Sequence, residues 1–146
     1  MKTRTPILLL SAFFAISILT SCEKETVLPA SEVPAEITTY VKNHFSDHKI
    51  LQVIKDKDGF SKTYDVILEG GFSLEFDRKL KIIDIDGTGR LPDSVIPAKI
   101  LDYVSQNYSG NYITDWEIDG KNQQVGLENE LELEFNRSGE FLRIDG

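Results

Sequence analysis

Two acidic runs have the spacing of calcium ligands in a binding loop, with oxygen-bearing side chains at positions one, three and five and glycine at position six. The runs are Asp84-Ile85-Asp86-Gly87-Thr88-Gly89 and Asp115-Trp116-Glu117-Ile118-Asp119-Gly120. Position twelve, which should be a bidentate glutamate, is Val95 in the first run and Gly126 in the second. Carboxylates two residues apart also mark the solvent side of a strand or turn, so a calcium site is the alternative to a structural role for these residues.

The two histidines, His44 and His48, are four residues apart, a spacing that can place two zinc ligands on one helical face. A zinc site needs a third ligand, and the sequence offers no further histidine and a single cysteine, Cys22. We therefore expect both histidines to face solvent near a helix C-terminus, where the helix dipole favours cations. The sequence contains no Ser-His-Asp set, phosphate loop or dinucleotide fingerprint, so it predicts a protein that is not an enzyme.

A denser group of carboxylates is expected on the exposed face of a sheet, where a basic protein partner could bind it. Charged strand residues also improve solubility and discourage unwanted pairing, which is the alternative explanation. Three apolar residues, Ile67, Tyr112 and Trp116, are candidate anchors for the partner. Trp116 could equally be core, because it stands where Val53 stands in the first copy of the sequence repeat described next. The predicted partner-binding carboxylates are Glu69, Glu75, Glu128, Glu130, Glu132 and Glu134.

These residues belong to a sequence that is repeated once. The segment from Leu28 to Val41 returns 63 positions later as Leu91 to Val104. Further on, Leu74-Glu75-Phe76 and Ile85-Asp86-Gly87 return 59 positions later as Leu133-Glu134-Phe135 and Ile144-Asp145-Gly146. The four residues missing from the second copy fall between Lys55 and Thr63, whose composition is typical of a hairpin tip.

Each repeat begins with a predicted helix. Pro34 and Pro97 stand in the first turn, where a missing N–H costs nothing. The apolar residues after them recur at helical spacing and make one narrow stripe that must be buried. They are Ile37, Tyr40, Val41 and Phe45 in the first repeat and Ile100, Tyr103, Val104 and Tyr108 in the second.

After each helix the apolar period changes from 3.6 to 2, which predicts strands. First strands are expected at 50–57 and 113–118, and turns at 69–71, 77–79, 128–129 and 136–139. The fold class predicted is α+β, with two tandem repeats that each comprise one helix followed by a four-stranded antiparallel sheet, packed as one unit. We expect either one eight-stranded sheet or two abutting four-stranded sheets, with both helices on the same face.

The N-terminus has the pattern of an export signal. Lys2 and Arg4 precede an uncharged apolar run over 6–19 that is shorter than a bilayer-spanning helix. Leu19-Thr20-Ser21-Cys22 is similar to the lipobox of bacterial lipoproteins, in which the cysteine thiol is acylated and becomes the new N-terminus. We therefore predict a lipid anchor at Cys22 and a location in the cell envelope, at the outer membrane.

The negative net charge of the chain limits the kinds of molecule that it can bind. The whole chain has a net charge of −8, and loss of Lys2 and Arg4 with the signal brings residues 22–146 to −10. Such a surface repels nucleic acid and anionic lipid headgroups. The predicted partner is an unidentified envelope protein, basic in character, and the only membrane contact predicted is the lipid on Cys22.

The repeated motif, with a proline-led helix and strands of the form Val66-x-Leu68, Leu74-Glu75-Phe76-Asp77 and Ile85-Asp86-Gly87, resembles the PepSY-like, beta-lactamase-inhibitor-like family of exported bacterial proteins. The second copy reads Val125-x-Leu127, Leu133-Glu134-Phe135-Asn136 and Ile144-Asp145-Gly146. The resemblance implies tandem helix-plus-sheet repeats and an inhibitory or binding role, and it implies no catalytic residue. Family members usually have glycine after the acidic turn residue, as at Gly139, whereas the first copy has Lys79-Leu80.

The expected organisation is a signal peptide over 1–21, a tether over 22–30, a first repeat over 28–87, a linker over 88–90 and a second repeat over 91–146. The predicted function is that of a lipid-anchored, non-enzymatic envelope protein that binds a protein partner through an acidic exposed sheet face, with inhibition of the partner as one outcome of binding. The alternative function is that of a calcium-responsive or metal-binding periplasmic protein that uses Asp84, Asp86, Asp115, Glu117 and Asp119, and a third possibility is a purely structural spacer. No cofactor is predicted apart from calcium in that alternative.

Overall fold

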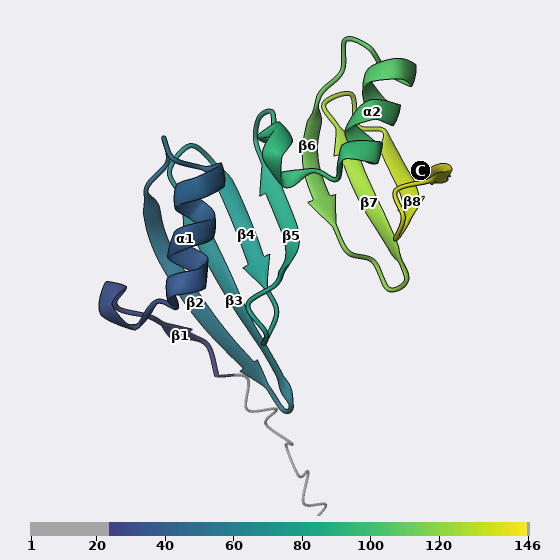
Figure 1. Ribbon diagram of the computed structural model, residues 1–146. Coiled ribbons are helices and arrows are strands. Elements are labelled where there is room, and N and C mark those ends of the chain that lie inside the picture. The colour runs from purple at the N-terminus through teal and green to yellow at the C-terminus, as the bar shows by residue number, and fades with distance from the viewer. Residues whose placement is uncertain (1–23, 146) are drawn as a thin grey trace, which may run out of the picture.

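The computed structural model describes residues 24–145, which form one antiparallel sheet with two helices packed on one face (Figure 1). The strands pair in chain order, each with the next. They are β1 (Thr26–Val27), β2 (Ile50–Asp58), β3 (Ser61–Leu68), β4 (Phe72–Phe76), β5 (Ile82–Gly87), β6 (Ile113–Glu117), β7 (Asn122–Leu127), β8 (Glu132–Asn136) and β9 (Phe141–Asp145). The helices are α1 (Ala35–His44) and α2 (Ala98–Asn107), each preceded by a short 3-10 helix, η1 (Ala30–Glu32) or η2 (Asp93–Val95).

The two helices begin and end in the same way. Pro34 and Pro97 occupy the N-cap positions, one residue ahead of the predicted first turn, and neither makes a side-chain cap. At the other end, the Phe45 N–H donates to the Val41 carbonyl and the Tyr108 N–H to the Val104 carbonyl. The predicted apolar stripes face the sheet, since Ile37 and Val41 of α1 and Ile100 and Val104 of α2 are buried in the core.

One face of the sheet, here called the helix face, is covered by α1 and α2. A continuous row of apolar side chains crosses this face from β2 to β8, and every member of the row is buried. The row consists of Val53, Val66, Leu74, Ile85, Trp116, Val125 and Leu133. It joins the buried residues of both helices in one hydrophobic cluster, so the two repeats share a core. The opposite side, the outer face, has no helix over it among the described residues.

The predicted fold class is wrong in its architecture. The strands do not form two four-stranded sheets, each attached to its own helix, but one nine-stranded sheet that makes the protein mostly β. The reason is that β5 of the first repeat pairs directly with β6 of the second, with Ile85 opposite Trp116. The ninth strand, β1, comes from the range predicted as the tether and pairs with β2, with Val27 opposite Ile54.

The turns keep their backbone shape even where the repeated sequences differ. Gly139 has a φ of 79°, and the corresponding residue of the first repeat, Leu80, has a φ of 60°. Gly71 has a φ of 80°, and its counterpart Glu130 has a φ of 66°. Non-glycine residues rarely adopt this region, so the pairing of the flanking strands sets the turn conformation in both repeats.

Neither helix within residues 24–145 has the length and hydrophobicity needed to cross a bilayer. Cys22 and the predicted signal over 1–21 lie outside the described residues.

Candidate functional site

Four carboxylates stand side by side across the outer face, and we call them the acidic row. Asp65 of β3 is opposite Glu75 of β4, Glu75 is opposite Asp84 of β5, and Asp84 is opposite Glu117 of β6. Residues adjacent to them in the strands, such as Val66, point to the helix face, so the alternation of the strands sends the carboxylates outward. The acidic row therefore passes without interruption over the junction between the two repeats.

A second cross-strand pair lies beside the row, with Asp86 of β5 opposite Asp115 of β6. Together with Asp84 and Glu117 it forms a group of four carboxylates, which we call the junction square. Gly126 of β7 makes room for this group, since a Cβ there would clash with the carboxylate of Asp115. The repeat junction therefore gathers four carboxylates on two adjacent strands.

Burial, and after it the charge of nearby carboxylates inside and outside the acidic row, raises the pKa values of all four residues of that row. Burial, followed by the charges of Asp86, Glu117, Glu75 and Asp115, raises the pKa of Asp84 to about 6. Burial and neighbouring carboxylates also raise the pKa values of Asp65, Glu75 and Glu117. Like charges at this separation disfavour the ionised form, so the row at neutral pH holds repulsion that a bound cation would relieve.

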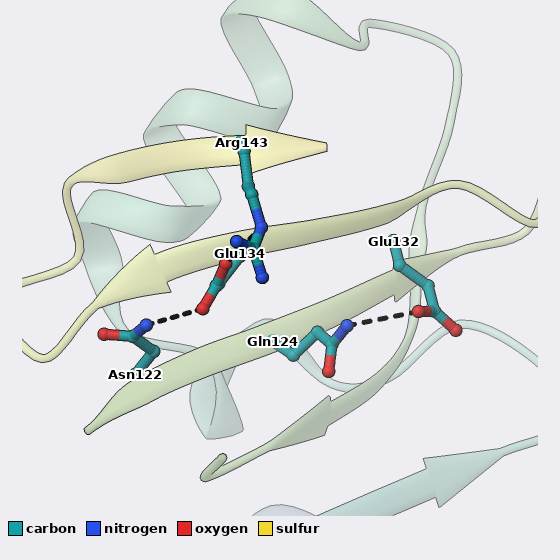
Figure 2. A network of polar contacts seen from close by, with 5 residues as sticks. All are labelled: Asn122, Gln124, Glu132, Glu134 and Arg143. Atoms are coloured by element: carbon teal, nitrogen blue, oxygen red, sulfur yellow. Dashed lines mark hydrogen bonds and ion pairs between the residues drawn. The ribbon is translucent and has the colours of Figure 1, made fainter. Parts of the chain in front are cut away.

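The outer face differs near β9, where the acidic side chains have polar partners (Figure 2). Glu134 accepts a hydrogen bond from Nδ2 of Asn122 at 2.5 Å and pairs with Nε of Arg143 at 2.7 Å. Nε2 of Gln124 donates to Oε2 of Glu132 at 3.1 Å. This network satisfies the carboxylates of β8, so the candidate site is the acidic row with the junction square.

The structure places four of the five predicted calcium ligands in the junction square and the fifth beside it, where burial and then the charge of Asp119 raise the pKa of Glu117. Asp84, Asp86, Asp115 and Glu117 form the junction square, whereas Asp119 lies in the turn after β6, where its carbonyl accepts the Asn122 N–H. The ligands are on strands and not in the loops that the spacing suggested. Within residues 24–145, no three His, Cys, Asp or Glu side chains are arranged to hold a metal ion.

The predicted partner-binding residues are spread over several environments. Glu75 belongs to the acidic row, and Ile67 lies on the outer face with 38% of its surface exposed. The remaining glutamates are either in the β8 network, as Glu132 and Glu134 are, or in the turns after β3 and β7, as Glu69, Glu128 and Glu130 are.

One of the two proposed aromatic anchors is buried in the core. Trp116 is on the helix face and only 6% exposed, and its Nε1 donates to Oε1 of Gln123 at 3.1 Å. Its prediction as a surface anchor is wrong, and the core alternative applies. Tyr112 is partly buried in the segment before β6, where its carbonyl accepts the Glu128 N–H.

The histidines do not share a helical face, because α1 ends at His44. Nδ1 of His44 lies 2.9 Å from Oγ of Ser94, in the second repeat. Nδ1 of His48 lies 2.7 Å from the Glu69 carbonyl, and its ring packs edge-on against Phe72. Both histidines therefore connect parts of the fold.

Asp65 is the member of the row that the predicted site did not include. Its alternation with Tyr64 and Val66 placed it on the outer face, but the sequence alone did not show which carboxylates lie opposite it. The same limit hid the junction square, because the pairing of β5 with β6 joins residues 31 positions apart, as for Ile85 and Trp116.

The chain matches the family described as "Putative beta-lactamase-inhibitor-like, PepSY-like" twice, over residues 18–84 and 62–143. The chain belongs to this PepSY-like family. The two overlapping matches are consistent with two repeats, as the sequence predicted. The search of curated proteins gave no match.

Solved structures similar to this chain include proteins from Bacteroides species. One, from Bacteroides thetaiotaomicron, is described as a "putative calcium-regulated periplasmic protein"; it is 31% identical, with a TM-score of 0.78 over 84% of this chain and 97% of that one. A second, from Bacteroides vulgatus, is described as a "putative periplasmic protein" of the DUF2874 family and is 29% identical, with a TM-score of 0.79 over 86% and 99% of the two chains. These similarities support a periplasmic location for this PepSY-like protein.

The repeated acidic or amide residue of the PepSY-like motif has a structural role here. Oδ1 of Asp77 accepts the N–H groups of Lys79 and Lys81, at 2.8 and 2.9 Å. Oδ1 of Asn136 accepts those of Ser138 and Glu140 in the corresponding turn. These side chains hold the turns that set the register of the sheet, and they do not contribute to the acidic row.

The raised pKa of Asp84 predicts that the free energy of unfolding falls as the pH rises from about 4 to above 6. In the folded protein the pKa is about 6, above its ordinary value of 3.8, so the folded state holds the proton more tightly than the unfolded chain. The stabilisation from protonation is present below about pH 4 and is lost as pH rises through 6. We expect Asp84→Asn to raise the free energy of unfolding at pH 7.5 by about 1 kcal/mol, allowing for solvent screening, and to reduce its dependence on pH.

Urea unfolding at several pH values between 4.5 and 7.5 measures this effect. Asp102→Asn, on the exposed side of α2, is the matched control and should leave the pH profile unchanged. A profile for Asp84→Asn that coincides with that of the unaltered protein would contradict the prediction.

Proposed function

We propose that this PepSY-like protein is a non-enzymatic periplasmic protein that binds a basic segment of a partner protein along the acidic row. The observation that carries the proposal is the uninterrupted row of carboxylates across β3, β4, β5 and β6, whose pKa values are raised by burial and then by nearby carboxylates. A cationic partner would add attraction between its charges and the carboxylates, which offsets the repulsion among them. Inhibition of the partner is one result that such binding can have.

The dimensions of the row favour an extended chain as its ligand. Neighbouring strands are about 4.8 Å apart, so four strands place the first and last carboxylates roughly 14 Å from each other. An extended peptide turns every second side chain to the same side, about 7 Å apart. Lysine or arginine at alternate positions would therefore match the row with about three side chains.

Neutralising the row should abolish most of this binding. In the triple variant Glu75→Gln/Asp84→Asn/Glu117→Gln, we expect affinity for a deca-lysine probe to fall at least about tenfold, because each lost charge pair contributes up to about 1 kcal/mol. Fluorescence anisotropy at low and moderate salt measures the affinity, which should weaken as salt screens the charges.

The matched control is Glu32→Gln/Asp47→Asn/Asp102→Asn, which changes the net charge equally at exposed positions outside the row. An equal loss of affinity in both variants would show a general charge effect and would remove the row as the binding site. The same pair of variants applied to envelope extracts identifies proteins whose capture depends on the row.

A second candidate function, binding of calcium, is favoured by the junction square. Its four carboxylates come from two adjacent strands, and hard oxygen ligands are those that calcium prefers. The similar protein from Bacteroides thetaiotaomicron is described as calcium-regulated. Binding would require the carboxylates of Asp84, Asp86, Asp115 and Glu117 to converge on one ion.

Thermal unfolding with added calcium tests this candidate. A site with a dissociation constant of about 0.1 mM would stabilise the protein by about 1.4 kcal/mol at 1 mM calcium, which corresponds to a rise in Tm of roughly 5 °C. The double variant Asp84→Asn/Asp115→Asn should lose that rise. No rise in the unaltered protein at 10 mM calcium, or the same rise in both proteins, would remove calcium from the proposal.

We also propose that the protein is held at the outer membrane by a lipid on Cys22, which the lipobox-like sequence supports. Cell fractionation should find the unaltered protein with the envelope and Cys22→Ser in the soluble periplasmic fraction or as unprocessed precursor. Metabolic labelling with a fatty acid should mark only the unaltered protein. Labelling of Cys22→Ser at the same level would contradict the anchor.

A further inference from the structure

The sheet ends at β9, and this edge is open. β9 pairs with β8 on one side, and no other described strand lies along its second side. Two of its apolar side chains are exposed, Leu142 by 48% and Ile144 by 52%. A strand edge with free backbone groups and exposed apolar side chains favours pairing with another strand.

The first repeat shows how the equivalent edge is covered. Leu142 and Ile144 of β9 correspond to Ile83 and Ile85 of β5, 59 positions earlier. β5 is paired with β6, and Ile85 is fully buried there. The same position is therefore core where a further strand is present and exposed where none is.

The backbone groups that such a strand would use can be identified. The Ile83 carbonyl accepts the Ile118 N–H at 2.8 Å, so the backbone of Ile83 is turned toward β6. Both strands have their register shift at the corresponding point, after Glu75 and after Glu134. By this correspondence, the backbone groups of Leu142 and Ile144 point away from β8 and toward the open side.

The opposite edge of the sheet is already occupied. β1 lies along β2, and hydrogen bonds continue on both sides of it, from the Lys24 N–H to the Lys57 carbonyl and from the Leu28 N–H to the Val53 carbonyl. In a second copy of the chain, β9 can therefore accept another strand directly, whereas β2 could do so only after β1 had left it.

We propose that two copies of the chain join through antiparallel pairing of β9 with β9, forming a two-fold dimer. The same patch is used by both copies, as closed two-fold symmetry requires. A register with Ile144 opposite Ile144 would let the outward backbone groups meet and cover the exposed apolar side chains. The pairing continues the junction already present between β5 and β6, and it does not depend on the acidic row.

Cysteine cross-linking in cells tests the dimer. The full chain with Ile144→Cys, expressed with its own export signal and treated with a mild oxidant, should give a disulfide-linked homodimer as its main cross-linked product. Leu51→Cys is the matched control, since Leu51 is apolar, is 65% exposed and lies on β2. Cys22 is present in both variants, so any product that it forms appears equally in both.

A second measurement uses no new cysteine. Sedimentation of the unaltered protein, extracted in detergent, should give twice the chain mass, and Leu142→Lys/Ile144→Lys should sediment as a monomer with an unchanged circular dichroism spectrum. The proposal is overturned if Ile144→Cys gives no more homodimer than Leu51→Cys, if it links mainly to a different protein, or if the unaltered protein sediments as a monomer.

Discussion

The arrangement of this protein depends on the backbone pairing of β5 with β6. β5 is the last strand of the first repeat, and β6 is the first strand of the second. This pairing turns two sequence repeats into one sheet and places Ile85 beside Trp116 within a common core. Because side chains alternate along a strand, the same register must bring Asp84 beside Glu117 on the outer face. Burial of apolar residues on one face and crowding of carboxylates on the other are therefore two consequences of one contact.

The sequence predicted the local features well. Both helices, the change to period-two patterning and the position of the hairpin between β2 and β3 follow from residues close together in the chain. The architecture was not predictable in this way, since strand order and register depend on contacts between distant residues. β1 illustrates the limit, because its two residues, Thr26 and Val27, have no period of their own and become a strand only through pairing with β2.

The candidate site was predicted in part for the same reason. Alternation identified Glu75, Asp84, Asp86, Asp115 and Glu117 as outward-facing carboxylates, but only the register shows which of them are neighbours. Trp116 was ambiguous in the sequence, because an aromatic residue can serve as a surface anchor or as core. The burial of its ring and its hydrogen bond to Gln123 decide for the core.

The two ends of the outer face show how repeats of common sequence can acquire different properties. Near β9, Arg143 and Asn122 compensate Glu134, whereas at the junction Asp84 is surrounded by carboxylates that raise its pKa. The end near β9 has Arg143 where the first repeat has Asp84, and the pairing of β5 with β6 adds Glu117 and Asp115 to the carboxylates around Asp84. The junction square therefore exists only where the two repeats meet.

The short strand β1 has a consequence for assembly. Val27 lies opposite Ile54 of β2, and Ile54 is the counterpart of Glu117 in the second repeat. β1 therefore pairs with β2 at the position where β5 pairs with β6, with Asp84 opposite Glu117. If β2 were bare, the last strand of one molecule could add to the first long strand of the next, and such head-to-tail contacts would grow into open filaments without limit. Because β1 occupies that position, two residues from the range predicted as the tether close this edge of the sheet to such head-to-tail addition.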